Sequence, residues 1–287
     1  MHYYFLSVSG IAIQLESEED LSVQEAFIPF LTEQTEPDIR AVFRQTAPLS
    51  NMPGQEVYRD GFWQICLNED GTPVRYFYNT PGDRDPYALA VWNGNTLRVE
   101  YLPSEVWRFS ELQNCFFYLD LEQILMQHHR LWPHASCVET PLGAILFSGV
   151  SGIGKSTQAE LWCKYRNARQ INGDRPILAK EQGSWLAWGA PYAGSSRCYV
   201  NDSCSVSAII MLQQSKQCSL RRLNLPEAFR ALWPGLALHS WDRDYMERAS
   251  RLAIDLLGSI PVYKFSCTPD EQAVDYLEQA LRKDLKL

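Results

Sequence analysis

The residues from Gly149 to Ser156 have the types and the spacing needed to bind phosphate. They read Gly-Val-Ser-Gly-Ile-Gly-Lys-Ser, a complete G-x-x-x-x-G-K-[ST] pattern. Glycines allow a tight turn, so that successive backbone N–H groups and the start of a following helix can surround a polyphosphate. Lys155 would then reach the β- and γ-phosphates, and the Ser156 hydroxyl could ligate Mg²⁺. The segment therefore predicts a nucleotide-phosphate site.

A carboxylate follows a short distance along the chain, in the run Asn172-Gly173-Asp174-Arg175. At the end of a strand, Asp174 could hold Mg²⁺ directly or through water, or accept a proton from an attacking hydroxyl. Asn-Gly-Asp is also strong turn chemistry, so a purely structural turn remains the alternative.

The flanking segments predict the elements that would position these residues. An apolar strand at 143–148 precedes the loop and a helix over 157–165 follows it. A second strand is expected at 134–138, and an apparent β-hairpin at 176–188 follows Asp174.

Two further helices are expected from their patterns. Residues 118–130 carry apolar side chains at helical spacing. The final helix is expected to begin with Thr268 as its N-cap and Pro269 in its first turn. Its apolar stripe would contain Ala273, Val274, Leu277 and Leu281.

Residues 1–115 form a different region, in which short alternating or aromatic runs are separated by turn-rich clusters. The segment 87–101 predicts a hairpin around Asn93-Gly94. This half contains no catalytic pattern, and we predict a β-rich recognition or packing domain.

Composition excludes several classes of protein. The 287 residues are 46% hydrophobic and 21% charged, which excludes a disordered or fibrous chain. A net charge of −8 argues against a nucleic-acid-binding protein. The apolar stretches are far shorter than the ~20 residues of a membrane span, and no secretory signal begins the chain. The eight scattered cysteines lack the spacing of a zinc site. We expect a cytoplasmic protein with reduced thiols and no membrane partner.

The order of the motifs resembles the catalytic domain of HPr kinase/phosphorylase, and more closely the stand-alone HPr-kinase-like proteins found beside peptide-modifying enzymes. The order is His134-Ala-Ser, the apolar strand, the loop, Asn172 to Arg175, a hairpin, and Gly189-Ala-Pro-Tyr-Ala-Gly194. The resemblance covers about residues 120 to 282 and implies a nucleotide site of the phosphoenolpyruvate-carboxykinase type. It implies that ATP phosphates contact the loop residues Gly149, Ser151, Gly152, Ile153, Gly154, Lys155, Ser156 and Thr157. It also implies that Ser156 and Asp174 organise Mg²⁺ and that His134 lies near the transferred phosphoryl group.

One departure concerns the residue before Asp174. Bifunctional HPr kinases have two adjacent acidic residues there, whereas this chain has Gly173. Either Asp174 serves both purposes or another group replaces the missing acid. Glu139, at the end of the strand bearing His134, is a candidate base expected to lie close to the loop, although a surface glutamate in a turn is the plainer reading. The Glu-Ile-Arg-Gly-Leu-Gly type signature of the bifunctional enzymes is also absent, with Gly189 to Gly194 in its place, so phosphorylated HPr is not the expected product.

These observations predict an α/β protein with a β-rich domain at 1–115 and an HPr-kinase-like, ATP-binding domain with a mixed, curved sheet at 116–287. The expected activity is Mg²⁺-dependent transfer of the γ-phosphoryl group of ATP to a hydroxyl of a peptide, a protein or a small molecule. Lys155, Asp174, His134 and Glu139 are the candidate catalytic residues. A nucleotide switch or ATPase without an acceptor, and a catalytically silent peptide-binding module, remain alternatives. A homo-oligomer remains open.

Overall fold

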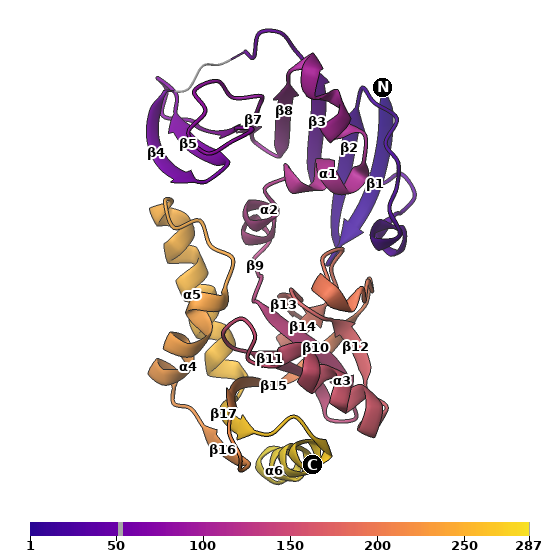
Figure 1. Ribbon diagram of the computed structural model, residues 1–287, viewed down its shortest axis with the longest axis vertical. Coiled ribbons are helices and arrows are strands. Elements are labelled where there is room, and N and C mark those ends of the chain that lie inside the picture. The colour runs from indigo at the N-terminus through magenta and orange to yellow at the C-terminus, as the bar shows by residue number, and fades with distance from the viewer. Residues whose placement is uncertain (51–53, 287) are drawn as a thin grey trace. The chain divides into compact units, whose positions relative to one another are not determined.

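The structure is a computed structural model that describes residues 1–50 and 54–286. The chain divides into two compact units, Met1–Ile124 and Leu125–Leu287. Both units have mixed, curved sheets (Figure 1). In the described residues, no helix is long and apolar enough to cross a bilayer. None of the eight cysteines forms a disulfide within this part of the chain.

The N-terminal unit is built on one mixed sheet, with the strand order β1-β2-β3-β8-β7-β6-β5-β4 among its described residues. The strands are β1 His2–Val8, β2 Ile11–Ser17, β3 Ile39–Gln45, β4 Gln55–Asp60, β5 Trp63–Leu67, β6 Pro73–Phe77, β7 Ala88–Asn93 and β8 Thr96–Tyr101. β3 lies parallel to β2 and to β8, and the other pairs are antiparallel. The predicted hairpin at 87–101 is confirmed as β7 and β8.

Short helices accompany this sheet and supply aromatic side chains to its core. They are η1 Glu25–Phe30, η2 Pro103–Phe109 and α1 Leu112–Phe117. A further short helix, α2 Leu121–Gln127, has no aromatic residue and contains the boundary between the two units. The ring of Phe109 stacks on Tyr101 of β8 with 3.9 Å between the ring centroids. The helix expected over 118–130 is present but shorter, as α2. Asp120 has φ 55°, a left-handed conformation that interrupts a helix and separates α1 from α2.

The C-terminal unit contains a second mixed sheet, which includes a central run of parallel strands. Its strands are β9 Arg130–Leu131, β10 Ala135–Thr140, β11 Gly143–Ser148, β12 Arg169–Asn172, β13 Ile177–Glu181, β14 Ser184–Trp188, β15 Ser203–Gln214, β16 Ser219–Arg222 and β17 Val262–Cys267. β15 lies parallel to β11 on one side and to β17 on the other. The carboxyl ends of these three strands therefore meet at one edge of the sheet, which is where α/β proteins place their ligands.

Helices cover both faces of this sheet. They are α3 Lys155–Arg166, η3 Gly194–Ser196, α4 Leu225–Leu232, η4 Trp233–Gly235, α5 Arg243–Ser259 and α6 Glu271–Leu285. Alternate residues of β11 face opposite layers. Leu146 packs in the cluster that contains α4 and α5, and Phe147 packs with α3 and α6. Burial on both faces explains why this strand is a continuous apolar run.

The start of α6 differs from the sequence-based expectation. Its N-cap is Asp270, whose side chain accepts a hydrogen bond from the Ala273 amide, so Thr268 is not the cap. A carboxylate at this position both accepts the orphan amide and interacts favourably with the helix dipole. The predicted apolar stripe is confirmed, because all four of its residues are fully buried.

Candidate functional site

The glycine-rich loop, residues 149–154, connects the end of β11 to the start of α3. Gly154 is the N-cap of α3 and has φ 112°, a conformation that favours glycine. No side chain caps this helix end. Among the described residues, the amides of Gly154, Lys155 and Ser156 donate to no acceptor in the protein. The loop therefore presents unsatisfied N–H groups and the positive end of a helix dipole to a ligand.

The Lys155 side chain folds back over the first half of this loop. Its Nζ atom donates hydrogen bonds to the carbonyl oxygens of Gly149, at 3.3 Å, and of Val150, at 3.2 Å. The residue is only 7% exposed. Burial lowers the pKa of this ammonium group, nearby Arg175 lowers it further, and Asp174 opposes both. A buried cation held by two neutral carbonyl groups is a favourable partner for an anion.

Asp174 is positioned by an asparagine two residues before it. The Oδ1 atom of Asn172 accepts hydrogen bonds from the amides of Asp174, at 2.9 Å, and Arg175, at 2.7 Å. Asn172 is fully buried, and its Nδ2 atom donates to the carbonyl of Tyr192 at 2.8 Å. The Asp174 carbonyl accepts from the amide of Ala135. The turn is therefore clamped to the start of β10, next to His134.

His134 and Asp174 contact each other through their side chains. Nε2 of His134 lies 3.1 Å from Oδ1 of Asp174, and both side chains are about one-third exposed, at 30% and 37%. Burial, and then Lys155, lower the pKa of His134 by more than Asp174 raises it. A neutral imidazole that donates from Nε2 to the carboxylate leaves Nδ1 as an acceptor.

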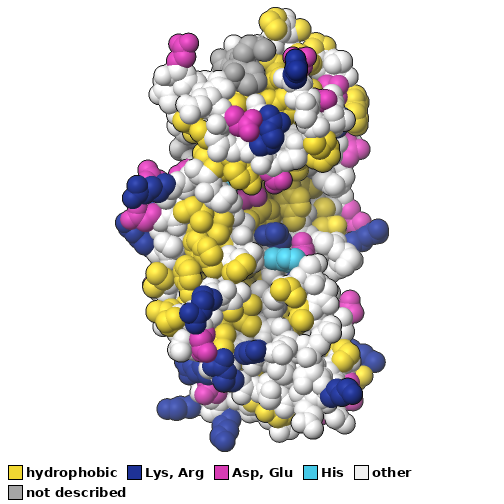
Figure 2. Space-filling model, turned by 60° about the vertical axis from the view of Figure 1, so that its left-hand side comes forward, with side chains coloured by type: hydrophobic (Ala, Val, Ile, Leu, Met, Phe, Trp, Pro, Cys, Tyr) yellow, Lys and Arg dark blue, Asp and Glu magenta, His cyan; other side chains and the backbone are white. Residues whose placement is uncertain are grey.

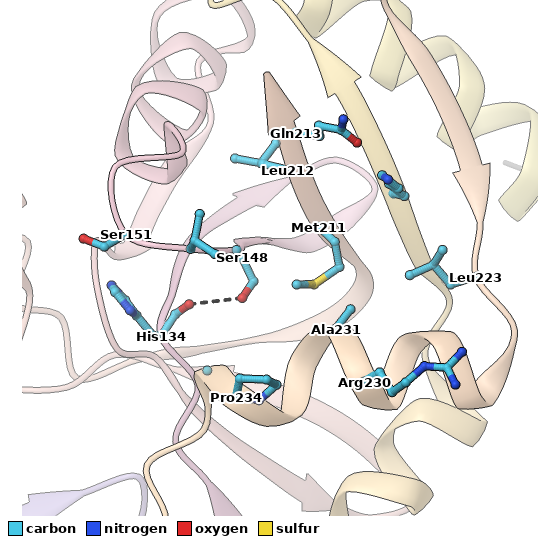
Figure 3. A pocket seen from close by; sticks show the side chains of 14 residues that line it. His134, Ser148, Ser151, Met211, Leu212, Gln213, Leu223, Arg230, Ala231 and Pro234 are labelled. Atoms are coloured by element: carbon cyan, nitrogen blue, oxygen red, sulfur yellow. Dashed lines mark hydrogen bonds between the residues drawn. The ribbon is translucent and has the colours of Figure 1, made fainter. Parts of the chain in front are cut away.

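The backbone of His134 ties these groups to the loop. Its carbonyl accepts a hydrogen bond from the hydroxyl of Ser148, the last residue of β11, at 3.1 Å (Figure 3). Its amide donates to the carbonyl of Gly235 at 2.7 Å. The structure thus brings together Lys155, Asp174 and His134, which lie far apart in the sequence.

Two cavities border the glycine-rich loop. The larger, with a volume of about 670 Å³, is lined by His134 and by residues of the first half of the loop, from Gly149 to Ser151. The smaller, with a volume of about 440 Å³, is lined by residues of the second half and of the first turn of α3, among them Gly154 and Gln158. The two halves of the loop therefore face different cavities.

Comparison with solved structures gives distant likenesses. The chain is similar to the HPr(Ser) kinase/phosphatase from Coxiella burnetii, with 13% sequence identity and a TM-score of 0.34. The likeness covers 54% of this chain and 99% of that one. No protein-family model matches the chain, and no curated protein matches it. Because a TM-score this low does not establish a shared fold, the function proposed below is based on the geometry of the site.

Glu139 does not join the site, so the expectation that it lies close to the loop is wrong. β10 and β11 are antiparallel, with Ala135 opposite Ser148 and Glu139 opposite Ala144. Glu139 therefore lies four strand positions, about 13 Å, from the end of the hairpin that leads into the glycine-rich loop. Its carboxylate pairs with Arg169 at 2.7 Å, and Arg169 also contacts Asp202.

Replacement of Glu139 provides a test of this assignment. Glu139→Gln is expected to leave any ATP turnover within about twofold of the wild-type rate, since the side chain contacts no other candidate residue. The loss of a half-exposed ion pair should lower the free energy of unfolding by at most about 1 kcal/mol. Steady-state turnover and urea denaturation measure the two effects. A large fall in turnover with an unchanged free energy of unfolding would show that Glu139 takes part in catalysis.

Several residues of the site escaped prediction from the sequence. Arg230 of α4 and Lys264 of β17 line the larger cavity, and Ser148 tethers His134. Lys264 had a weak signal, because it is a lone charged residue at an alternate position between Tyr263 and Phe265. For Arg230 the sequence contained no signal of a role in the site, since a basic residue in an amphipathic helix is usually a solvated surface residue.

Proposed function

We propose that the C-terminal unit is an ATP- and Mg²⁺-dependent kinase that transfers the γ-phosphoryl group to a hydroxyl acceptor. The observation that carries the proposal is the buried Lys155 ammonium beside backbone amides that have no acceptor in the protein. A triphosphate would supply acceptors to these amides and negative charge to the ammonium group.

The loop geometry supports one orientation for the nucleotide. The ammonium of Lys155, which serves the β- and γ-phosphates in such loops, contacts Gly149 and Val150, and both of these line the larger cavity. The reacting end of the triphosphate would therefore face the larger cavity. The nucleoside would extend past the first turn of α3 toward the smaller cavity, which Gln158 lines.

The donor set fits Mg²⁺. The Ser156 hydroxyl makes no hydrogen bond within the described residues, and Asp174 offers a carboxylate that is about one-third exposed. Mg²⁺ prefers such oxygen ligands and completes its octahedron with water and substrate phosphates. When bound, the ion would neutralise charge on the phosphates during transfer.

His134 would handle the proton of the acceptor. It lines the larger cavity, and Asp174 orients its ring. The acceptor oxygen would form a bond to the γ-phosphorus while the bond from that phosphorus to the β–γ bridging oxygen breaks, and the electron pair leaves with ADP. The hydroxyl proton would pass to Nδ1 of His134. This arrangement needs no second acidic residue at position 173.

Asp174→Asn tests this function, because it preserves shape and removes the charge. The wild-type protein is expected to bind ATP and, with Mg²⁺, to phosphorylate a member of a panel of hydroxyl compounds and peptides, detected by mass spectrometry. Asp174→Asn should bind ATP but turn over about 10²-fold more slowly. Stoichiometric phosphate release without a phosphorylated product would identify an ATPase or switch. Nucleotide binding without turnover would identify a binding module, and either result would contradict the kinase.

A further inference from the structure

The larger cavity extends from the glycine-rich loop at one end to two basic side chains at the other. Figure 3 shows His134, Ser148 and Ser151 on one side and Arg230 of α4 on another. Lys264 of β17 also lines it. A volume of about 670 Å³ lies in the range of pockets for small molecules.

The wall between these two ends is largely apolar. Met211 and Leu212 of β15, together with Leu223 and Ala231, line this part of the cavity. A ligand that reaches from the loop to Arg230 would therefore place a carbon skeleton along this wall and polar groups at its two ends. Apolar walls with a few placed polar groups are the usual construction of small-molecule sites.

The basic end of the cavity carries two cationic side chains, Arg230 and Lys264, that form no close ion pair within the described residues. Lys264 lies directly opposite Arg221 across the antiparallel pair of β16 and β17, so their side chains share one face of the sheet. Arg221 is paired with Glu227 of α4, at 2.9 Å. Within residues 1–50 and 54–286, neither Arg230 nor Lys264 has a carboxylate within 4.0 Å. Lys and Arg side chains gather over this part of the C-terminal unit (Figure 2).

This protein has a net charge of −8, so two cations at one end of a cavity are a local feature and not a consequence of basic composition. Arg230 interacts electrostatically with Glu227 one turn before it, but Glu227 already pairs with Arg221. The two cations at this end of the cavity therefore share little negative charge from the protein. A bound anion would interact favourably with both cations, and the planar guanidinium of Arg230 suits the two oxygens of a carboxylate or a phosphate.

We propose that the larger cavity is the acceptor subsite, and that it takes a small hydroxyl compound bearing a carboxylate or phosphate group, which Arg230 and Lys264 bind. The hydroxyl would lie at the His134 end and the anionic group at the α4 end. The assignment of this ligand as an acceptor rests on the kinase proposed above, whereas the binding of the anion does not.

The test uses three probes that share a six-carbon polyhydroxyl skeleton: glucose, which is neutral, gluconate, a carboxylate, and glucose 6-phosphate. Calorimetry on the full, nucleotide-free chain is expected to show at least one anionic probe binding about tenfold or more tightly than glucose. The double variant Arg230→Ala/Lys264→Ala should lose that preference. Arg222→Ala is the matched control, because Arg222 lies next to Arg221 on β16 but pairs with Asp284 of α6.

The two anionic probes distinguish the sources of the charge, since a preference for gluconate indicates a carboxylate and a preference for glucose 6-phosphate a phosphate. Equal affinity for all three probes, no binding of any, or an unchanged preference in the double variant would overturn the proposal. ATP affinity is measured in parallel and should be unchanged in the double variant. A tenfold loss of ATP affinity in the double variant would show that the two cations bind the nucleotide, and this result would also overturn the proposal. Anion binding without phosphoryl transfer would contradict the kinase and leave the anion site standing.

Discussion

Lys155→Met is expected to abolish ATP-dependent turnover while the protein remains folded. Methionine has a similar length and fits the buried position, but it removes the ammonium that contacts the Gly149 and Val150 carbonyls. The loss of one preorganised charged donor at a transferring phosphoryl group reduces rates by at least about 10²-fold, or about 3 kcal/mol. Turnover and ATP affinity should both fall, because the same group would bind the phosphates in the ground state.

The matched control is Lys164→Met in the same helix. Lys164 lies over the ring of Tyr165, outside the two cavities that border the loop. It should retain wild-type turnover, and circular dichroism should show both variants folded. Undiminished ATP consumption in folded Lys155→Met would refute the phosphate-binding role of the loop.

Gly173→Ala is expected to destabilise the protein and to lower its turnover. A Cβ atom at position 173 would lie 2.1 Å from Oγ and 2.4 Å from Cβ of Ser196. Rotation of the serine does not relieve the second contact, and its hydroxyl is held by the carbonyl of Ala193 at 2.6 Å. The turn at 194–196 would have to move, at a cost of about 1–3 kcal/mol. Because Gly194 packs against Asp174, that movement should also displace the carboxylate.

A double-mutant cycle tests the cause of this effect. Ser196→Gly removes both colliding atoms, so Gly173→Ala/Ser196→Gly should be more stable than the sum of the single changes by about 1 kcal/mol or more. Urea denaturation of the four proteins measures the coupling. Additive free energies of unfolding would show that Ser196 is not the obstacle. Gly173→Asp meets the same obstacle and should lower turnover rather than raise it.

This packing gives a physical reason for the departure noted in the sequence. The resemblance to HPr kinases leads one to expect two adjacent acids, but the side chain of Ser196 fills the space that the first would need. The competition arises between residues 23 positions apart, and it depends on how the turn at 194–196 folds back onto Asp174. Local patterns carry no information on such a contact.

Structural features that depend only on residues adjacent in the sequence could be predicted. The strand at 143–148 follows from its continuous apolar run and the hairpin at 176–188 from its strand pattern and turn chemistry, and both are present. Errors arose where one residue changed a local preference. Asp120 adopts a left-handed conformation, so the helix expected from residue 118 begins only at Leu121, and Asp270 caps α6 in place of Thr268. Several side chains compete to accept the same orphan amides at a helix start, so the position of the cap is poorly determined by pattern alone.

The residue types and their order were sufficient to predict the glycine-rich loop and its place between a strand and a helix, since one continuous segment contains its turn, its ammonium group and its helix start. The rest of the site depends on strand pairing over long distances. Antiparallel pairing of β10 with β11 places His134 beside the loop and Glu139 at the far end. The β16–β17 pair and α4 bring Lys264 and Arg230 to one cavity. Such contacts form only when distant segments are buried together, because that burial, and not local conformational preference, selects which strands and helices become neighbours.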